Sequence, residues 1–108
     1  MKTKEITSKG IKIYIEEKGK EIARAYLYIM YNDIHKEPFG LLEDVYVSES
    51  LRGKGFGTKL VSETIKLAKK NKCYKLIATS RYSRPRVHEL YKKLGFEDWG
   101  KEFRMNFE

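Results

Sequence analysis

The segment Leu51–Thr58 reads LRGKGFGT, with three glycines at alternate positions. An apolar run, Val45–Val47, precedes this segment, and residues 56–71 carry apolar side chains at helical spacing. A strand, a glycine-rich turn and an amphipathic helix in this order predict the first part of a β-α-β unit. Because such a unit closes with a second strand parallel to the first, this segment constrains the middle of the fold to a parallel strand pair.

The residues before this unit predict antiparallel strands. Isoleucines alternate with polar residues over 11–17, and a Lys-Gly-Lys turn separates them from a longer strand over 21–32. Two strands joined by a short turn form an antiparallel hairpin. The strand that enters the glycine turn is expected over 40–47, after Pro38 and Gly40.

The residues after the first helix predict a short apolar strand over 74–79 and then a second helix. Pro85 suits the first turn of this helix, and Gly95 suits the position just past its end. The last segment, FEDWGKEFRMNF, is expected to form a hairpin or two short strands. The expected element order is therefore β-β-β-α-β-α-β-β.

This order predicts an α/β fold with a mixed sheet, in the α+β sense. Antiparallel N-terminal strands precede a parallel β-α-β unit, and the helices pack on the sheet. The length of 108 residues fits a single domain over residues 1–108. Hydrophobic residues make up 41% of the chain and charged residues 35%, which is typical of a folded globular protein.

Composition excludes several classes of protein. No apolar run approaches the roughly 20 residues that span a bilayer, and the N-terminus lacks the apolar core of a signal peptide. Cys73 is the single cysteine, so the sequence predicts neither an internal disulfide nor a metal site. We expect a cytoplasmic protein without membrane contact. The net charge of +8 favours anionic partners, either nucleic acid or a phosphate-rich cofactor.

The glycine turn is a candidate anion site. The first N–H groups of a helix have no intrahelical partner, the helix dipole adds about half a positive charge there, and glycines let an anion approach the backbone. The spacing Gly53-x-Gly55-x-Gly57 matches neither the dinucleotide fingerprint nor a nucleotide-hydrolysing P-loop. The residues alone thus leave two interpretations, a phosphate site and a loose surface loop.

The segment LLEDVYVSESLRGKGFGTKLV resembles the core motif of the GCN5-related N-acetyltransferase (GNAT) family. That motif is Arg or Gln, two residues, Gly, one residue, and Gly or Ala, and here Arg52, Gly55 and Gly57 fill it. A second family feature is a helical tyrosine followed by a Gly-Phe pair, which HELYKKLGFE supplies with Tyr91. The resemblance covers Leu41–Phe107.

The resemblance implies a GNAT-like fold with splayed parallel strands and acetyl-coenzyme A as the cofactor. The cofactor pyrophosphate would be held by backbone N–H groups of the glycine turn, and its pantetheine arm would pair with the preceding strand. Arg84 stands where many family members have an asparagine, and it would meet the cofactor phosphates. The other implied cofactor-binding residues are Val45, Tyr46, Val47, Arg52, Gly53, Lys54, Gly55, Phe56, Gly57 and Thr58.

Acetyl transfer to an amine needs a base, because an ammonium group with a pKa near 10.4 is not a nucleophile at neutral pH. Glu43 and Asp44 are carboxylates on the strand before the glycine turn. Strand alternation predicts Glu43, Val45 and Val47 on one face and Asp44 and Tyr46 on the other. We favour Glu43 as the base, with Asp44 or a water molecule as alternatives.

The departing coenzyme A thiolate needs a proton. Tyr91 lies in the apolar stripe of the second helix, where its position alone is typical of a core tyrosine. The resemblance implies that the Tyr91 hydroxyl donates this proton.

The acceptor is not identified by the sequence. Two helices that the family places between its first strands have no counterpart here, so the acceptor site is open unless a second subunit of a homodimer closes it. Within the family the motif looks most similar to that of spermidine/spermine acetyltransferases, although a net charge of +8 would repel a polyamine.

The favoured function is therefore an acetyl-coenzyme A-dependent N-acetyltransferase that acts on a primary amine of a small molecule or a protein. One alternative is a basic nucleic-acid-binding module, suggested by the charge and by eight tyrosines. Nucleic acid is the less favoured partner, because it leaves the glycine turn unexplained. Another alternative is a catalytically weak coenzyme A-binding regulatory protein.

Overall fold

The computed structural model describes residues 1–107 of the chain. The chain divides into two compact units, Met1–Ala78 and Thr79–Glu108. The single domain expected over residues 1–108 stays a prediction. Within the described residues, every helix is too short or too polar to cross a membrane.

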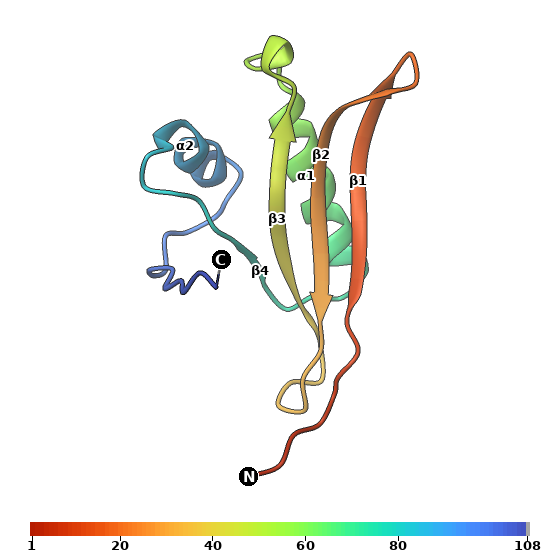
Figure 1. Cartoon of the computed structure of the whole chain (residues 1–108), viewed down its shortest axis with the longest axis vertical. Helices are drawn as coiled ribbons and strands as arrows, with labels where there is room; N and C mark the ends of the chain where they lie inside the picture. Colours follow the sequence, from red (N-terminus) through yellow and green to blue (C-terminus); the bar gives the residue numbers. More distant parts are fainter. Residues whose placement is uncertain (108) are drawn as a thin grey trace. The chain divides into compact units, whose positions relative to one another are not determined.

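In chain order the elements are β1 (Lys9–Glu17), β2 (Lys20–Met30), β3 (Phe39–Val47), η1 (Glu49–Leu51), α1 (Phe56–Lys70), β4 (Leu76–Ala78) and α2 (Pro85–Lys93) (Figure 1).

The first unit contains a four-stranded sheet in the order β1-β2-β3-β4. β2 is antiparallel to both β1 and β3, whereas β3 and β4 are parallel, which confirms the mixed sheet. Lys18 and Gly19 join β1 to β2 with φ angles of 51° and 77°, the two positive values of a type I′ hairpin turn. Parallel pairing with β4 is confined to residues 40–42 of β3, so the second half of β3 extends beyond that ladder.

One face of the sheet packs against α1, which lies behind β1, β2 and β3 in Figure 1. In β2, alternate side chains from Ala23 to Ile29 are buried on this face. Thr64 of α1 is fully buried, and its hydroxyl donates a 2.8 Å hydrogen bond to the Leu60 carbonyl, so its polar atom is satisfied. The buried residues of the helix are Leu60, Val61, Thr64 and Ala68.

The second face of the sheet carries aromatic and charged side chains. Arg24, Tyr26 and Tyr28 of β2 are half-buried there, and Tyr14 of β1 is 52% exposed. The rings of Tyr26 and Tyr28 lie nearly parallel, with centroids 6.2 Å apart. Because α1, the long helix of this unit, lies on the opposite face, these polar and aromatic groups face away from it.

A β-bulge in β3 changes which residues share a face. Glu43 pairs with Tyr26, and Tyr46 pairs with Arg24, so two residues of β3 lie opposite Ala25 alone. Asp44, one of the two, has a φ of 51°. The predicted alternation is therefore wrong for both Tyr46 and Val47: the extra residue brings Tyr46 onto the face of Glu43 and moves Val47, which pairs with Ala23, to the other face.

Strand β4 is shorter than the predicted strand over 74–79. The N–H of Cys73 donates to the Ala68 carbonyl at 3.0 Å, and the N–H of Tyr74 donates to the Pro38 carbonyl at 2.9 Å. These bonds hold the chain in a turn after α1, and ladder pairing with β3 starts at Leu76.

In the second unit, Pro85 opens α2 and Gly95 follows the helix with a φ of 103°, as predicted. The hairpin or strands predicted over 96–107 are wrong, since these residues form no strand. The side chains of Phe103 and Phe107 are 91% and 90% exposed. An alternating apolar pattern forms a strand only with a neighbouring strand to pair with, and an isolated hairpin is marginal in water.

Candidate functional site

The candidate site begins where β3 ends. After η1, the side chain of Arg52 turns back, and its Nε donates a 3.0 Å hydrogen bond to the carbonyl of Val47. Gly53 and Gly55 follow with φ angles of 82° and 87°, a left-handed conformation that other residues rarely adopt. A Cβ atom at either glycine would meet nothing within 4 Å. The backbone conformation, and not a lack of space, therefore requires these two glycines.

The turn leads into α1 with Gly55 at the N-cap position and without a side-chain hydrogen bond to cap the helix. The N–H of Lys59 donates to the Gly55 carbonyl at 3.1 Å. The N–H groups of Phe56, Gly57 and Thr58 precede this first intrahelical donor, so the helix itself gives them no acceptor. Together with the helix dipole, these N–H groups form a surface suited to an anion.

The charge around this turn is positive. Arg52 and Lys54 are exposed, and the first turn of α1 contains no acidic residue. Backbone donors, glycines that allow close approach, and two cations are the groups that a diphosphate requires. The residues from Arg52 to Thr58 therefore form a turn whose chemistry suits a diphosphate, and their role in cofactor binding stays a prediction.

The ring of Tyr46 connects this turn to the second face of the sheet. The guanidinium carbon of Arg24 lies 4.7 Å from the ring centroid, and that of Arg52 lies 5.6 Å from it. Both distances fall within the range of cation–π contacts. Glu43 is half-buried on the same face, in the cross-strand pair with Tyr26 that precedes the bulge. The remaining predicted strand residues, Val45 and Val47, are half-buried at the end of β3.

Charged groups of β1 and β2 border this face. Lys12 donates a hydrogen bond to Glu21, which lowers the pKa of the Glu21 carboxyl and raises the pKa of Lys12. Arg24 is 3.7 Å from the other Glu21 oxygen, longer than an ordinary hydrogen bond. Glu21 is thus held mainly by Lys12, and Arg24 is only loosely paired.

The second unit carries the other predicted site residues. Tyr91 is half-buried on α2, and its ring centroid lies 5.2 Å from that of Phe96. Arg84 is exposed at the N-cap position of α2, where its carbonyl accepts hydrogen bonds from the N–H groups of Val87 and His88. Within this unit the residues that resemble the family tyrosine and its Gly-Phe pair are in contact.

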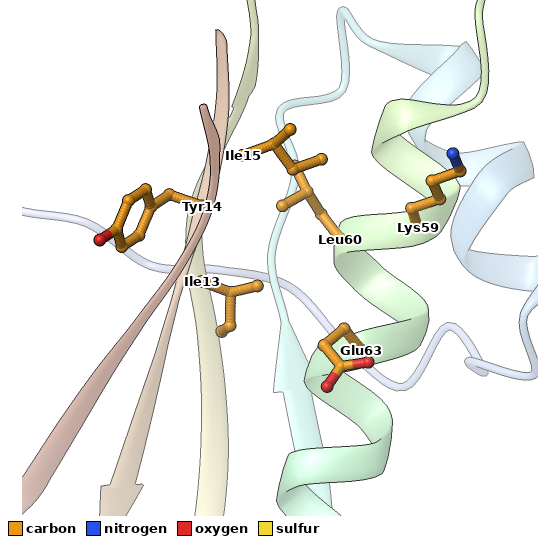
Figure 2. Close-up of a pocket in the computed structure, with 6 residues that line it drawn as sticks. All are labelled: Ile13, Tyr14, Ile15, Lys59, Leu60 and Glu63. Atoms are coloured by element: carbon orange, nitrogen blue, oxygen red, sulfur yellow. The ribbon is translucent and has the colours of Figure 1, made fainter. Parts of the chain in front are cut away.

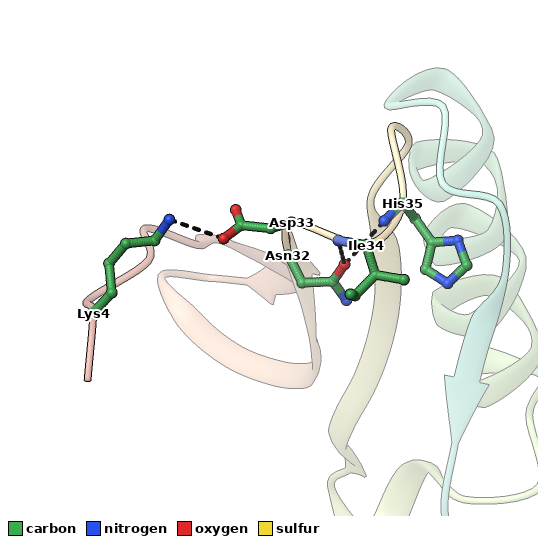
Figure 3. A network of polar contacts seen from close by, with 5 residues as sticks. All are labelled: Lys4, Asn32, Asp33, Ile34 and His35. Carbon is green, nitrogen blue, oxygen red and sulfur yellow. Dashed lines mark hydrogen bonds and ion pairs between the residues drawn. The ribbon is translucent and has the colours of Figure 1, made fainter. Parts of the chain in front are cut away.

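The side chains of both histidines, His35 and His88, contact groups outside the predicted site residues of their own unit. In Figure 3, Asn32 Oδ1 accepts hydrogen bonds from the N–H groups of Ile34 and His35, at 2.8 and 3.1 Å, in the loop before β3. The ring of His35 packs on Tyr74. The ring of His88 is bonded instead to the backbone carbonyl of Arg81. Local structure thus accounts for both imidazoles.

A shallow cavity of about 270 Å³ lies between β1 and α1. Figure 2 shows Ile13 and Ile15 directed toward Leu60 of the helix, whereas Tyr14 projects from the other side of β1. None of the predicted site residues lines this cavity. Its walls combine three apolar side chains that lie between the strand and the helix, Ile13, Ile15 and Leu60, with Tyr14, Lys59 and Glu63, so we treat it as a packing groove open to solvent.

The sequence reasoning missed Arg24 and Tyr26 as members of the second face. The available signal was the pattern of Ala23–Ile29, in which small and apolar residues alternate with an arginine and two tyrosines. That pattern is typical of a strand with one face on a core and one face outside it. No local sequence pattern indicates the bulge at Asp44, because the bulge depends on how β3 pairs with β2.

Comparison with known proteins agrees with this arrangement. The model of the Acetyltransferase (GNAT) family matches residues 4–96, and the chain belongs to that family. The family uses acetyl-coenzyme A. A putative acetyltransferase from Agrobacterium tumefaciens has a similar structure, with a TM-score of 0.78, 31% identity, and coverage of 86% of this chain and 65% of that one. The acetyltransferase Tb11.01.2886 from Trypanosoma brucei has a TM-score of 0.81 at 26% identity, with coverage of 91% and 69%, which confirms the GNAT-like fold.

The curated relatives include glucosamine 6-phosphate N-acetyltransferases. The protein of that name from Candida albicans is 33% identical over 90 residues, which cover 82% of this chain and 58% of that protein. The one from Trypanosoma brucei brucei is 35% identical over 68 residues, with coverage of 62% and 44%. The chain thus spans about half the length of the curated relatives that it matches.

Proposed function

We propose that the protein transfers the acetyl group of acetyl-coenzyme A to a primary amine. The observation that carries this proposal is the uncapped first turn of α1, reached through two left-handed glycines from a strand that also bears Glu43. A diphosphate at this turn would leave the second half of β3, which the β4 ladder does not reach, available to the pantetheine arm of the cofactor. The contributing residues are those from Val45 to Val47 and from Arg52 to Thr58, with Arg84 as a further phosphate contact.

The cofactor supplies an acetyl thioester. Glu43 accepts a proton from the acceptor ammonium, directly or through water, so that the neutral amine attacks the thioester carbon. As the new C–N bond formed and the C–S bond broke, the hydroxyl of Tyr91 would donate a proton to the departing thiolate, and the proton still carried by the acylated nitrogen would pass through water to restore that hydroxyl. The backbone N–H groups at the end of β3 would polarise the thioester carbonyl.

We propose an amino sugar phosphate, such as glucosamine 6-phosphate, as the acceptor. The names of the curated relatives support this choice. The net charge of +8 also favours an anionic acceptor over a polyamine. We also propose that the protein acts in the cytoplasm and forms a homodimer whose second subunit closes the acceptor site.

Two measurements test this function. Calorimetry with acetyl-coenzyme A should give saturable binding, and a thiol assay should detect coenzyme A released when glucosamine 6-phosphate is added. An absence of binding at millimolar acetyl-coenzyme A would overturn the proposal. Binding without thiol release in the presence of any primary amine would indicate a regulatory protein instead of an enzyme.

A further inference from the structure

The second face of the sheet offers a cation beside the proposed base. We propose that Arg24 binds an anionic group of the acceptor and thereby selects amines that carry a phosphate. This inference rests on the proposed function, because Glu43 marks the place of the reacting amine. Neither the family motif nor the names of the relatives assign a role to Arg24.

Arg24 retains hydrogen-bonding capacity. Its side chain is 35% exposed, and its ion pair with Glu21 is long at 3.7 Å. The hydrogen bond from Lys12 already neutralises Glu21. A guanidinium offers five N–H donors in a planar fork, and the distant Glu21 oxygen uses little of that capacity.

The contact with Tyr46 orients this guanidinium. The guanidinium carbon of Arg24 lies 4.7 Å from the Tyr46 ring centroid, which limits its motion through the cation–π contact. An arginine held in this way is better suited to phosphate oxygens, which it binds with two parallel N–H groups, than a flexible lysine.

The spacing between Arg24 and Glu43 fits a small acceptor. The pairs Arg24–Tyr46 and Tyr26–Glu43 are neighbouring cross-strand pairs on the same face. Diagonal neighbours of this kind are roughly 7–8 Å apart in a sheet, and the bulge at Asp44 lies between these two pairs. One sugar ring, with an amine on one side and a phosphate on the other, spans a distance of this size. The acceptor amine would then lie at Glu43 and its phosphate at Arg24.

The positive charges around this face argue against a polyamine as the acceptor. Arg24 and Arg52 both border it, whereas the charges of Lys12 and Glu21 offset each other in their ion pair. A second ammonium group on the acceptor would meet these cations, whereas a phosphate would be attracted by them.

The test compares two acceptors that differ by one phosphate, glucosamine 6-phosphate and glucosamine. The ratio of their kcat/KM values should fall about 10-fold to 100-fold in Arg24→Gln, because a charge-assisted pair to the phosphate is lost. Arg24→Lys should recover part of the ratio. Lys66→Gln removes the same charge from the exposed side of α1 and should leave the ratio unchanged.

The outcomes separate this inference from the proposed function. An equal loss with both acceptors, or no loss, would overturn the role of Arg24 while leaving the acetyltransferase intact. If the wild-type protein releases no coenzyme A, the proposed function fails. Calorimetry of glucosamine 6-phosphate binding then tests whether Arg24 binds the phosphate. Weaker binding to Arg24→Gln than to Lys66→Gln would then support the anion site, and equal or absent binding would overturn it.

Discussion

At the scale of single residues, the backbone distinguishes Glu43 from Asp44. Glu43 is half-buried and faces the aromatic side of the sheet, opposite Tyr26. Asp44 is exposed and adopts a φ of 51° in the bulge. Aspartate tolerates a left-handed conformation better than most residues, so Asp44 has a clear conformational role. This difference favours Glu43 as the residue with a chemical role.

We expect Glu43→Gln to lower kcat by about 100-fold or more near neutral pH, because the amide cannot accept the ammonium proton. The dissociation constant for acetyl-coenzyme A should stay nearly the same, which calorimetry checks. Asp44→Asn is the matched control, since it removes a neighbouring carboxylate while keeping a side chain that tolerates the bulge. A large loss in Asp44→Asn and none in Glu43→Gln would reverse the assignment of the base.

The left-handed glycines allow a prediction about stability. Gly55→Ala should destabilise the fold by about 1–2 kcal/mol, because an alanine at a φ of 87° is strained even with open space around its Cβ. It should also weaken acetyl-coenzyme A binding, because relief of the strain moves the N–H groups of α1. Gly100→Ala is the control, since its φ lies outside the left-handed region. Equal urea midpoints for both variants would contradict this explanation.

At the scale of elements, the sequence predicted most of the unit Met1–Ala78. The apolar run after the Lys-Gly-Lys turn predicted β2, and the helical stripe with its glycines predicted α1 and the candidate anion site. Those patterns are local, so the sequence displays them directly. The bulge in β3 and the missing strands over 96–107 depend on which partner strand is present, and a single sequence does not display partners.

The bulge itself can be tested by substitution at Asp44. Asp44→Gly should be neutral or stabilising, because glycine adopts positive φ without strain, whereas Asp44→Val should be about 1–2 kcal/mol less stable than Asp44→Gly. If valine instead removes the bulge, Tyr46 turns to the other face and its cation–π contact with Arg24 is lost. Urea denaturation compares the stabilities, and the NMR signals of the Tyr46 ring report its change of face. Equal stability of the two variants with unchanged Tyr46 signals would contradict the bulge.

At the scale of the whole molecule, the excess of 23 basic over 15 acidic residues acts on any anionic ligand. Such a field raises the local concentration of polyanions and is screened by salt. It supports binding of both proposed substrates, acetyl-coenzyme A and an amino sugar phosphate. It gives the same advantage to nucleic acid, so charge alone cannot identify the partner.

Salt therefore provides a test of the electrostatic share of cofactor binding. Raising KCl from about 0.05 M to about 0.5 M should increase the dissociation constant for acetyl-coenzyme A several-fold, because the Debye length falls below the spacing of the charges. Acetyl-pantetheine, which lacks the phosphates, should show little change in the same calorimetric titration. An equal response of the two ligands would show that the phosphates do not account for the effect.

The two-residue turn at Lys18 and Gly19 has a consequence for how the chain folds. A short loop costs little closure entropy, so β1 and β2 can pair within microseconds of collapse. The parallel pairing of β3 with β4 is expected to form later, because the two strands are separated in the chain by all of α1. We therefore expect the hairpin to form early, and a longer linker at this turn should slow refolding more than it speeds unfolding.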